Sequence, residues 1–376
     1  MAEVSLPQPV LTLIHTMTSA GFECFAVGGA VRDALMKRTT KDWDFTTNAT
    51  PPDMLKLFPD AYYNNQFGTV GIPQENGEIF EITTYRSEHG YSDRRRPDKV
   101  VWGTSLSEDL ARRDFTINAI ALRSIQSEPQ KYEIVDPYNG QDDIKNALIR
   151  CVGDADTRFK EDALRLLRAV RIATELQFLI EKETLSAMQK DAHLLESISG
   201  ERIQTELLRI LASSYAADGI LLLKNTGLLD YIIPELEPCF AVDQKSPERH
   251  HIYDVGTHLI ESLRNCRSKD PITRLATLIH DIGKPVVVKK TATGVITFYN
   301  HEVVSSGIAK TIAARLKFSK KDRDKLVTLV RWHQFTVDAH QTDSALRRFI
   351  VHVGVANLDD MIELRRADRI GGGARE

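Results

Sequence analysis

The chain contains little cysteine, no long hydrophobic run and no excess of basic residues. Its four cysteines (Cys24, Cys151, Cys239 and Cys266) form no C-x-x-C pair, which argues against a thiolate metal site and is typical of a reducing cytosol. No stretch approaches the ~20 apolar residues of a membrane span. Residues 1–10 lack the basic segment and apolar run of a signal peptide. We therefore expect a cytoplasmic protein without a membrane segment.

The charge balance excludes a polycation that binds nucleic acid through its whole surface. The net charge of the 376 residues is −3, so any nucleic-acid partner must be held by local basic patches. The hydrophobic fraction of 42% is ordinary for a chain that buries a core. The length predicts roughly two or three structural units.

The sequence pattern changes from β-rich to helical along the chain. Strands are predicted in the β-rich runs FECFAVGG, WDFTTN, TVGIP, IFEITTYR and KYEIVDP. Helices are expected near residues 7–20 and 107–123, and amphipathic helical patterns dominate from Phe159 onward. Pro247 and its polar neighbours indicate a linker near Phe240–His250. We predict an α+β fold with a head over residues 1–150, a helical neck and body over 151–240, and a further helical domain over 241–376.

The segment FAVGGAVRDAL is a candidate phosphate loop. A strand-like run ends at Gly28 and Gly29, and a helix-like run follows. Glycines let the backbone approach a ligand, and amides at a helix N-terminus bind phosphate. Arg32, in the first helical turn, can add a charge-assisted hydrogen bond to a triphosphate. A tight strand–helix turn without a ligand is the alternative interpretation.

The next segment, KDWDFTT, places two carboxylates two residues apart in a strand-like run. Strand geometry points Asp42 and Asp44 to the same face, roughly 6–7 Å apart along the strand. That spacing suits two divalent cations about 3.5–4 Å apart, as nucleotidyl transfer requires. Two solvated surface aspartates are the alternative. Glu81, in FEITTYR, is the best candidate for a third carboxylate, although a solvent-facing strand residue is an equal possibility.

Several motifs together resemble those of class II tRNA nucleotidyltransferases and bacterial poly(A) polymerases. In family order, over about residues 25–211, they are GGAVRD with DWD, YRSEHGYSDRRRPDKVVW, RRDFTINAIAL, VDPYNGQDDIKNALIRCVGD, EDALRLLRAVR and ERIQTELLRIL. The resemblance implies a polymerase-β-like head with a mixed β-sheet and two Mg²⁺ ions held by Asp42 and Asp44.

The resemblance also implies nucleotide contacts. Gly28, Gly29 and Arg32 match the phosphate-binding motif, Arg113 matches a further nucleotide contact, and Asp114 matches the ribose contact. Taken alone, RRD would be interpreted as an exposed helix start. The segment YRSEHGYSDRRRPDKVVW resembles the flexible loop of enzymes that add A as well as C, and its arginines 94–96 can also contact RNA phosphate.

The segment EDALRLLRAVR indicates how a protein selects C and A without a template. Asp162, Arg165, Arg168 and Arg171 recur every three residues opposite an apolar helical face, and the resemblance assigns nucleotide contacts to all four. Cytosine and adenine each offer an amino donor beside a ring-nitrogen acceptor. A carboxylate only accepts and a guanidinium only donates. Asp162 and Arg165 therefore match C and A, and at i and i+3 they can brace each other. A solvated amphipathic helix is the alternative.

Histidines and aspartates toward the end of the chain resemble an HD phosphohydrolase motif. His258, the pair His280–Asp281 and Asp368 match the H…HD…D pattern, and HDIGKP follows an apolar run. His301 and His333 match additional histidines of two-metal members of that superfamily. The resemblance implies a site for another divalent metal. A purely structural domain is the alternative.

These observations predict an enzyme that adds C and A from CTP and ATP to the 3′ end of tRNA. The alternatives are a poly(A) polymerase or A-adding enzyme, which shares most of the motifs, an HD-type metal-dependent phosphohydrolase acting on RNA or nucleotides, and a non-catalytic RNA-binding protein. Use of CTP separates the first two. The sequence does not predict an oligomeric state.

Overall fold

The computed structural model describes residues 6–40, 42–63, 68–89, 99–102, 105–125, 128–244, 253–292, 294–335 and 341–374. The chain divides into two compact units. Unit 1 comprises Met1–Arg165 and Phe178–Met188, and unit 2 comprises Leu166–Gln177 and Gln189–Glu376. Most of the predicted linker Phe240–His250 lies outside the described residues. No helix in the described part of the chain is long and apolar enough to span a membrane.

Unit 1 is built on a mixed sheet with the strand order β3-β4-β5-β2-β1-β8-β9. Its strands are β1 (Cys24–Val27), β2 (Asp44–Thr47), β3 (Tyr62–Tyr63), β4 (Thr69–Pro73), β5 (Ile79–Thr84), β8 (Ala121–Ile125) and β9 (Glu128–Val135). Strands β2 and β5 are parallel, whereas β1 pairs antiparallel with both β2 and β8. All five predicted strands are confirmed, and the mixed sheet confirms the α+β prediction.

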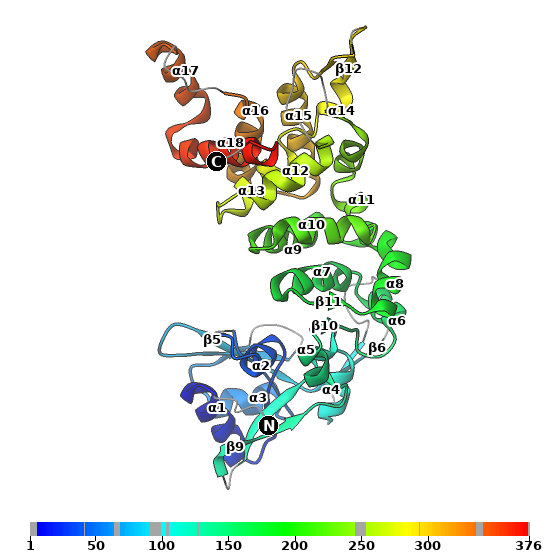
Figure 1. The fold of residues 1–376 in the computed structure, drawn as a ribbon. Helices are drawn as coiled ribbons and strands as arrows, with labels where there is room; N and C mark the ends of the chain where they lie inside the picture. Colours follow the sequence, from blue (N-terminus) through cyan, green and yellow to red (C-terminus); the bar gives the residue numbers. More distant parts are fainter. Residues whose placement is uncertain are drawn as a thin grey trace. The chain divides into compact units, whose positions relative to one another are not determined.

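The helices of unit 1 are short (Figure 1). They are α1 (Gln8–Ser19), α2 (Gly29–Leu35), α3 (Pro51–Leu57), α4 (Leu106–Ala111), η1 (Thr116–Asn118), α5 (Gly140–Lys145) and α6 (Ala155–Glu161). Helix α1 buries Val10, Leu13, Ile14 and Met17, the one-face spacing of an amphipathic helix. This face contributes to a core shared with the sheet residues Phe45 and Ile82 and their neighbours.

Two short strand pairs complete unit 1. They are β6 (Arg86–His89) with β7 (Lys99–Trp102), and β10 (Leu148–Ile149) with β11 (Leu179–Ile180), to which helix α8 (Lys182–Asp191) is attached. The prediction of one helix over 107–123 is wrong. Helix α4 ends at Ala111, and Phe115 then forms a β-bridge with Cys151. Residues 121–125 form β8 because they complete the sheet between β1 and β9.

Unit 2 is helical, as expected. Its elements are η2 (Ala192–Ser197), α9 (Gly200–Ala212), α10 (Ala216–Asn225), α11 (Leu229–Ile232), η3 (Pro234–Ala241), α12 (Val255–Arg264), α13 (Pro271–Ile279), α14 (Lys284–Val287), β12 (Lys289–Lys290), β13 (Ile296–Thr297), α15 (His301–Arg315), α16 (Lys320–Trp332), α17 (Asp343–Val353), η4 (Val355–Asn357) and α18 (Leu358–Gly371). Helix α7 (Leu164–Leu176) starts in unit 1 and continues into unit 2. Helix α12 packs against α13 and α18, and α13 packs against α16 (Figure 1).

Candidate functional site

The turn between β1 and α2 brings backbone, cation and carboxylate together. Gly28 has a φ of +78°, which a residue with a side chain rarely adopts. A Cβ on Gly28 would lie 3.2 Å from Arg113 Nη1 and 3.8 Å from Asp44 Oδ2. Glycine is therefore needed both for the turn and for the close approach. The predicted loop, Arg113 and Asp44 converge on one place.

The two predicted metal-binding aspartates lie just before and at the start of β2. Asp42 and Asp44 are exposed, whereas Trp43 between them is buried, as an alternating strand requires. Asp44 is the register partner of Glu81 across the parallel β2–β5 pair, so these two side chains share a face. Glu81 is exposed as well. Oxygen ligands of this kind suit Mg²⁺, so the three carboxylates form a candidate metal site.

A buried hydrogen-bonded chain links the predicted phosphate and ribose contacts. Arg32 Nη1 donates to Asn118 Oδ1 at 3.0 Å, and Asn118 Nδ2 donates to Asp114 Oδ1 at 3.1 Å. All three residues are buried. Asn118 was not among the predicted site residues. Its only sequence signal is its place four residues after Asp114 in RRDFTINAIAL.

Arg113 is held by Asp109, a carboxylate outside the predicted site residues. Arg113 Nη2 donates to Asp109 Oδ2 at 3.3 Å, and Arg112 Nη2 lies 2.7 Å from Asp109 Oδ1. Burial opposes ionisation of Asp109, but Arg112 and Arg113 outweigh it and lower its pKa. Arg113 Nε is buried and has no acceptor among the described residues. A buried donor without an acceptor is costly, so this nitrogen is suited to an anionic ligand.

Asp162 lies in a break between two helices, which corrects the prediction of one continuous helix through EDALRLLRAVR. Helix α6 ends at Glu161 and α7 begins at Leu164. Asp162 Oδ1 accepts from the N–H of Leu164 at 3.1 Å. The carboxylate therefore caps the start of α7, a role that aspartate favours.

Arg165 is fixed by contacts within unit 1. Its Nη1 donates to Glu161 Oε2 at 2.8 Å, and its Nη2 donates to the carbonyl of Arg112 at 2.9 Å. Only 11% of its side chain is exposed. Arg165 forms an ion pair with Glu161, and its bracing by Asp162 stays a prediction. Arg165 is thus tied to the residue that precedes Arg113.

Within unit 2, the two remaining arginines of this segment differ in burial. Arg168 is half-buried. Arg171 is buried and forms ion pairs with Glu206 at 2.6 Å and with Glu175 at 3.1 Å. Glu206 belongs to α9, so the segment ERIQTELLRIL holds α7 through this ion pair. The nucleotide contacts of Arg168 and Arg171 stay predictions.

We expect Glu206→Gln to destabilise unit 2 by about 2–4 kcal/mol, because removing one partner of a buried ion pair leaves the other charge poorly compensated. Thermal and urea unfolding, followed by circular dichroism, measure the change. Glu201→Gln changes an exposed glutamate of the same helix and serves as the control. Equal stability of the two variants would show that the Arg171–Glu206 pair contributes little.

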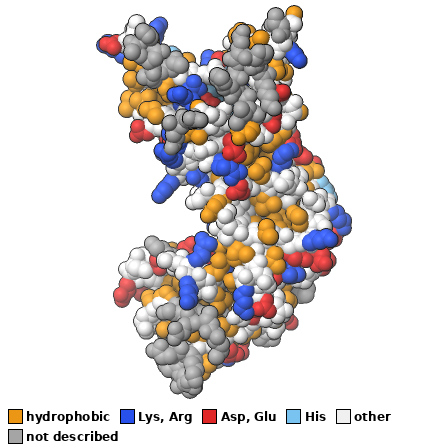
Figure 2. Space-filling view, in the orientation of Figure 1, with side chains coloured by type: hydrophobic (Ala, Val, Ile, Leu, Met, Phe, Trp, Pro, Cys, Tyr) orange, Lys and Arg blue, Asp and Glu red, His pale blue; other side chains and the backbone are white. Residues whose placement is uncertain are grey.

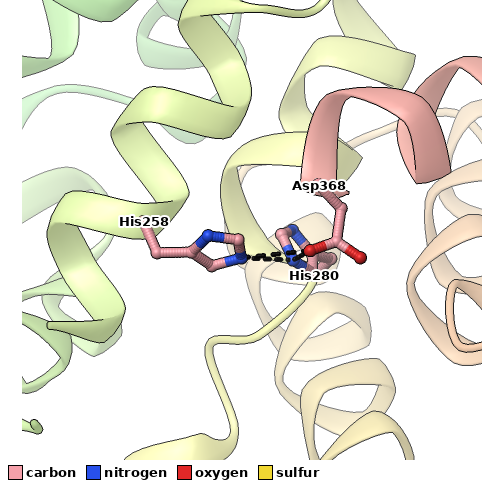
Figure 3. Close-up of side chains that lie close together, drawn as sticks. All are labelled: His258, His280 and Asp368. Carbon is pink, nitrogen blue, oxygen red and sulfur yellow. Dashed lines mark hydrogen bonds and ion pairs between the residues drawn. The ribbon is translucent and has the colours of Figure 1, made fainter. Parts of the chain in front are cut away.

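Three side chains of unit 2 point toward one another from three elements (Figure 3). His258 lies on α12, His280 follows α13, and Asp368 lies on α18. His258 Nε2 lies 3.3 Å from His280 Nε2 and 3.2 Å from Asp368 Oδ1, and His280 Nε2 lies 3.4 Å from that same oxygen. These residues form one group that can hold a metal ion.

Asp281 connects this group to a second group, which consists of Asp281, His301 and His333. Its Oδ2 lies 3.5 Å from His258 Nε2 and 3.4 Å from His280 Nε2. Its Oδ1 lies 2.9 Å from His301 Nε2 and 3.4 Å from His333 Nε2. The two oxygens of Asp281 therefore face two different sets of donors, so this carboxylate could hold a metal ion on each side.

Local structure orients these ligands. The Nδ1 atoms of His280, His301 and His333 each lie 2.8 Å from a backbone carbonyl, which only accepts a hydrogen bond. Each Nδ1 therefore carries the hydrogen, and in the neutral ring Nε2 keeps its lone pair toward Asp281. A Cβ on Gly283 would lie 2.8 Å from the carbonyl of His301. The glycine of HDIGKP thus allows α15 to pack closely enough to bring His301 to Asp281.

The charges of the group also suit a cation. Burial disfavours a charged His280, but Asp281 and Asp368 outweigh it and raise its pKa to about 10. Burial lowers the pKa of His333. Burial raises the pKa of Asp281, but Lys284 and His280 outweigh this effect and hold the pKa well below its usual range. Donors about 3.3 Å apart leave room for a cation about 2.1 Å from each, a distance typical of imidazole and carboxylate ligands.

We expect this group to bind two divalent ions with an affinity that increases with pH, because metal binding must displace the proton of His280, whose pKa is about 10. Asp281→Asn should weaken both ions on the order of a hundredfold, whereas His301→Ala should weaken only one. Titration calorimetry with Mn²⁺ after EDTA dialysis, in an Asp44→Asn background, measures both sites.

His193→Ala replaces an exposed histidine of unit 2 and is the control for that titration. Unchanged Mn²⁺ binding in Asp281→Asn would contradict the bridging role.

A cavity of about 850 Å³ opens onto the second group in unit 2. Its lining includes Asp281, His301, His333 and Asp368, and three cations, Lys284, Arg365 and Arg369. Lys284 Nζ lies 2.6 Å from Asp281 Oδ2. The candidate metal-binding group is therefore accessible from a cavity that also carries positive charge. Lys284 is the lysine of the motif HDIGKP, but the motif alone assigned no role to it.

The surface of each unit carries charges of both signs (Figure 2). On the face that Figure 2 shows, basic and acidic side chains are interspersed, in keeping with the net charge of −3. The predicted flexible loop, with its arginines 94–96, lies largely outside the described residues.

Three regions of the chain match known protein families. Residues 24–150 match the Poly A polymerase head domain, residues 177–240 match the probable RNA and SrmB-binding site of polymerase A, and residues 250–368 match the HD domain. The CCA-adding enzyme of Geobacillus thermodenitrificans is 42% identical over 226 residues, which cover 60% of this chain and 54% of that relative. That of Levilactobacillus brevis is 43% identical over 230 residues, 61% of this chain and 55% of the relative.

Solved structures show the same fold. The Bacillus stearothermophilus CCA-adding enzyme in complex with CTP has a TM-score of 0.71 and 27% identity over 98% of this chain and 80% of that chain. The Thermotoga maritima CCA-adding enzyme complexed with tRNA has a TM-score of 0.62 at 18% identity, over 96% of this chain and 79% of that one. At that identity the second likeness shows the fold alone.

The matches identify a Poly A polymerase head domain and an HD domain in the same chain. With the three domain matches, the chain belongs to the tRNA nucleotidyltransferase and bacterial poly(A) polymerase family. The chain spans about half the length of the curated relatives that it matches.

Proposed function

We propose that this chain adds C and A from CTP and ATP to the 3′ end of tRNA without a nucleic-acid template. The observation that carries the proposal is the convergence of Gly28, Arg113 and Asp44 in unit 1. The same unit holds Asp162 and Arg165, and Arg165 donates to the backbone of Arg112 beside Arg113. The relatives named CCA-adding enzymes support this choice over a poly(A) polymerase.

Two Mg²⁺ ions are proposed at Asp42 and Asp44, with Glu81 beside them. The exposed carboxylates on one face fit a hard divalent cation. When bound, the ions favour deprotonation of the attacking hydroxyl and neutralise charge on the phosphates. The chain itself binds and orients the nucleotide. Arg32 and Arg113 contact the triphosphate beside Gly28 and Gly29, and Asp114 accepts from the ribose.

Base choice is proposed to rest on Asp162 and Arg165, with Arg168 and Arg171 as further nucleotide contacts. An acceptor-only group beside a donor-only group matches the edges of C and A and opposes those of G and U. The tRNA 3′-hydroxyl then attacks the α-phosphorus in line, and pyrophosphate leaves. Rigid placement of the reacting groups supplies much of the rate.

The test uses a tRNA transcript that ends before CCA, with labelled CTP and ATP supplied separately and together. Incorporation of C from CTP alone, and of C then A from both, is expected. No incorporation with Mg²⁺ present would refute the proposal. Addition of A alone to tRNA ending in CC would indicate an A-adding enzyme, and A-tailing of arbitrary RNA would indicate a poly(A) polymerase.

A second activity is proposed for the HD-type domain. The bridging Asp281 and the cavity cations Lys284, Arg365 and Arg369 suit hydrolysis of a phosphate ester. Bound metal would supply an activated water. Release of phosphate that survives Asp44→Ala and disappears in His280→Ala supports this activity. The metal's identity is left to elemental analysis.

The domain limits 1–150, 151–240 and 241–376 are proposed as the functional division of the chain into a catalytic head, a base- and RNA-binding neck and body, and the HD-type domain. Cytoplasmic localisation is proposed from the substrates, tRNA, CTP and ATP. Limited proteolysis and cell fractionation test these two points.

A further inference from the structure

Arg158 in α6 and Arg165 in α7 lie on either side of the break at Asp162, and both cap the end of α4. Arg158 Nη1 donates to the carbonyl of Ala111 at 3.2 Å. Arg165 Nη2 donates to the carbonyl of Arg112 at 2.9 Å. The last carbonyls of a helix have no partner within the helix, so these two guanidinium groups satisfy them and stabilise the end of α4.

Glu161 fixes both arginines at once. Its Oε1 lies 2.8 Å from Arg158 Nη2, and its Oε2 lies 2.8 Å from Arg165 Nη1. Arg165 Nη1 also donates to the backbone carbonyl of Arg158 at 3.1 Å. Between 11% and 20% of each of the three side chains is exposed. Charged hydrogen bonds in this setting are strong and directional. We call Arg158, Glu161 and Arg165 the neck clamp.

The capped carbonyls directly precede two proposed nucleotide contacts. Arg113 and Asp114 follow Arg112 in the chain. On their other side, Val152 N donates to the carbonyl of Asp114 at 3.0 Å, and Phe115 forms a bridge with Cys151. The position of Arg113 and Asp114 is therefore set by the neck clamp before them and by the bridge after them.

We propose that Arg158 is a positioning residue, which through the neck clamp couples base selection to placement of the ribose and triphosphate. The proposal rests on the proposed function. Arg165 is the proposed base contact, and the same guanidinium holds the peptide that carries Arg113. A base that engages Arg165 correctly leaves that peptide in place, whereas a base that displaces Arg165 also moves the ribose and phosphate contacts. The wrong base is thereby penalised in the chemical step as well as in binding.

A simple structural cap is the competing explanation, and the chain contains a matched control. Arg315 in unit 2 also joins a carboxylate to a backbone carbonyl. Its Nη1 donates to Glu235 Oε1 at 2.8 Å, and its Nη2 donates to the carbonyl of Ile232 at 3.2 Å. The chemistry equals that of Arg158, but the segment it holds has no proposed nucleotide contact. Arg315→Met therefore measures the purely structural effect.

The experiment compares Arg158→Met, Arg158→Lys and Arg315→Met in single-turnover incorporation of CTP and UTP onto tRNA lacking CCA. Arg158→Met is expected to lower the CTP rate constant about tenfold, with a smaller change in KM, because placement rather than affinity is lost. The UTP-to-CTP incorporation ratio should rise about tenfold. Arg158→Lys should restore part of the ratio, and Arg315→Met should lose thermal stability without changing it.

Glu161→Gln keeps the shape of the neck clamp but removes its charge, and it replaces Arg158→Met if that variant does not fold by circular dichroism. An unchanged UTP-to-CTP ratio in a folded Arg158→Met or Glu161→Gln variant would overturn the proposal, as would an equal rise in Arg315→Met. Failure of the wild-type chain to incorporate CTP would instead reject the proposed function.

Discussion

An Asp44→Asn variant is expected to incorporate nucleotides at least about a thousandfold more slowly than the wild-type chain, because a neutral amide neither holds a divalent cation nor offsets charge at the reacting phosphate. Asp44 is exposed and starts β2, so the substitution removes little packing. Its carboxylate lies at the Gly28 turn, beside Arg113. Single-turnover incorporation of labelled CTP onto tRNA lacking CCA measures the rate.

The control for this variant is Asp60→Asn, which changes an exposed aspartate outside the site. Both variants should unfold at the wild-type temperature and bind tRNA equally well. Phosphate release by the HD-type domain should also persist in Asp44→Asn. A rate within tenfold of the wild type would mean that Asp44 is not a metal ligand for the reaction.

The residues proposed for the head site could be selected from sequence because their signals are local. Alternation along a strand placed Asp42 and Asp44 on one face, and the structure has Trp43 buried between them. Gly28 has the positive φ that the turn needs. The register of Asp44 with Glu81 depends on which strands are neighbours, and a single strand's pattern does not contain that information.

The helix predicted over 107–123 failed because tertiary pairing overrode a helical pattern. Residues 121–125 form β8, which pairs with β1 on one edge and β9 on the other, and this pairing favours a strand. The break at Asp162 has a different cause. An aspartate competes for backbone N–H groups and favours a cap over a helix interior, and Asp162 accordingly accepts from Leu164.

The sequence named the residues that form the candidate metal-binding group of unit 2, but not how they contact one another. The motif HDIGKP and the scattered histidines indicated the ligands. That Asp281 directs one oxygen toward His280 and the other toward His301 follows from the packing of α15, which Gly283 permits. Asn118 and Glu161 were missed for a related reason. Their roles are contacts to other site residues, which have no sequence pattern of their own.

Asp162→Asn is expected to lower the preference for CTP over UTP about a hundredfold, because the amide can donate where the carboxylate only accepts. Asparagine caps helices about as well as aspartate, so the contact with Leu164 N–H that begins α7 should survive. The substitution thus changes base recognition while keeping the local fold. Parallel incorporation assays with CTP, ATP, UTP and GTP give the preference, and circular dichroism reports the helix content.

Asp154→Asn is the matched control for this substitution. Asp154 caps α6 by accepting from the N–H of Thr157 at 2.8 Å, eight positions before Asp162, and has no proposed contact with a base. Loss of preference in Asp162→Asn alone would assign base choice to that carboxylate. Loss in both variants would attribute the effect to helix capping, and retention in both would place the selection of C and A on other residues. Because the two substitutions are chemically identical, any difference between them arises from where the carboxylate lies relative to the nucleotide.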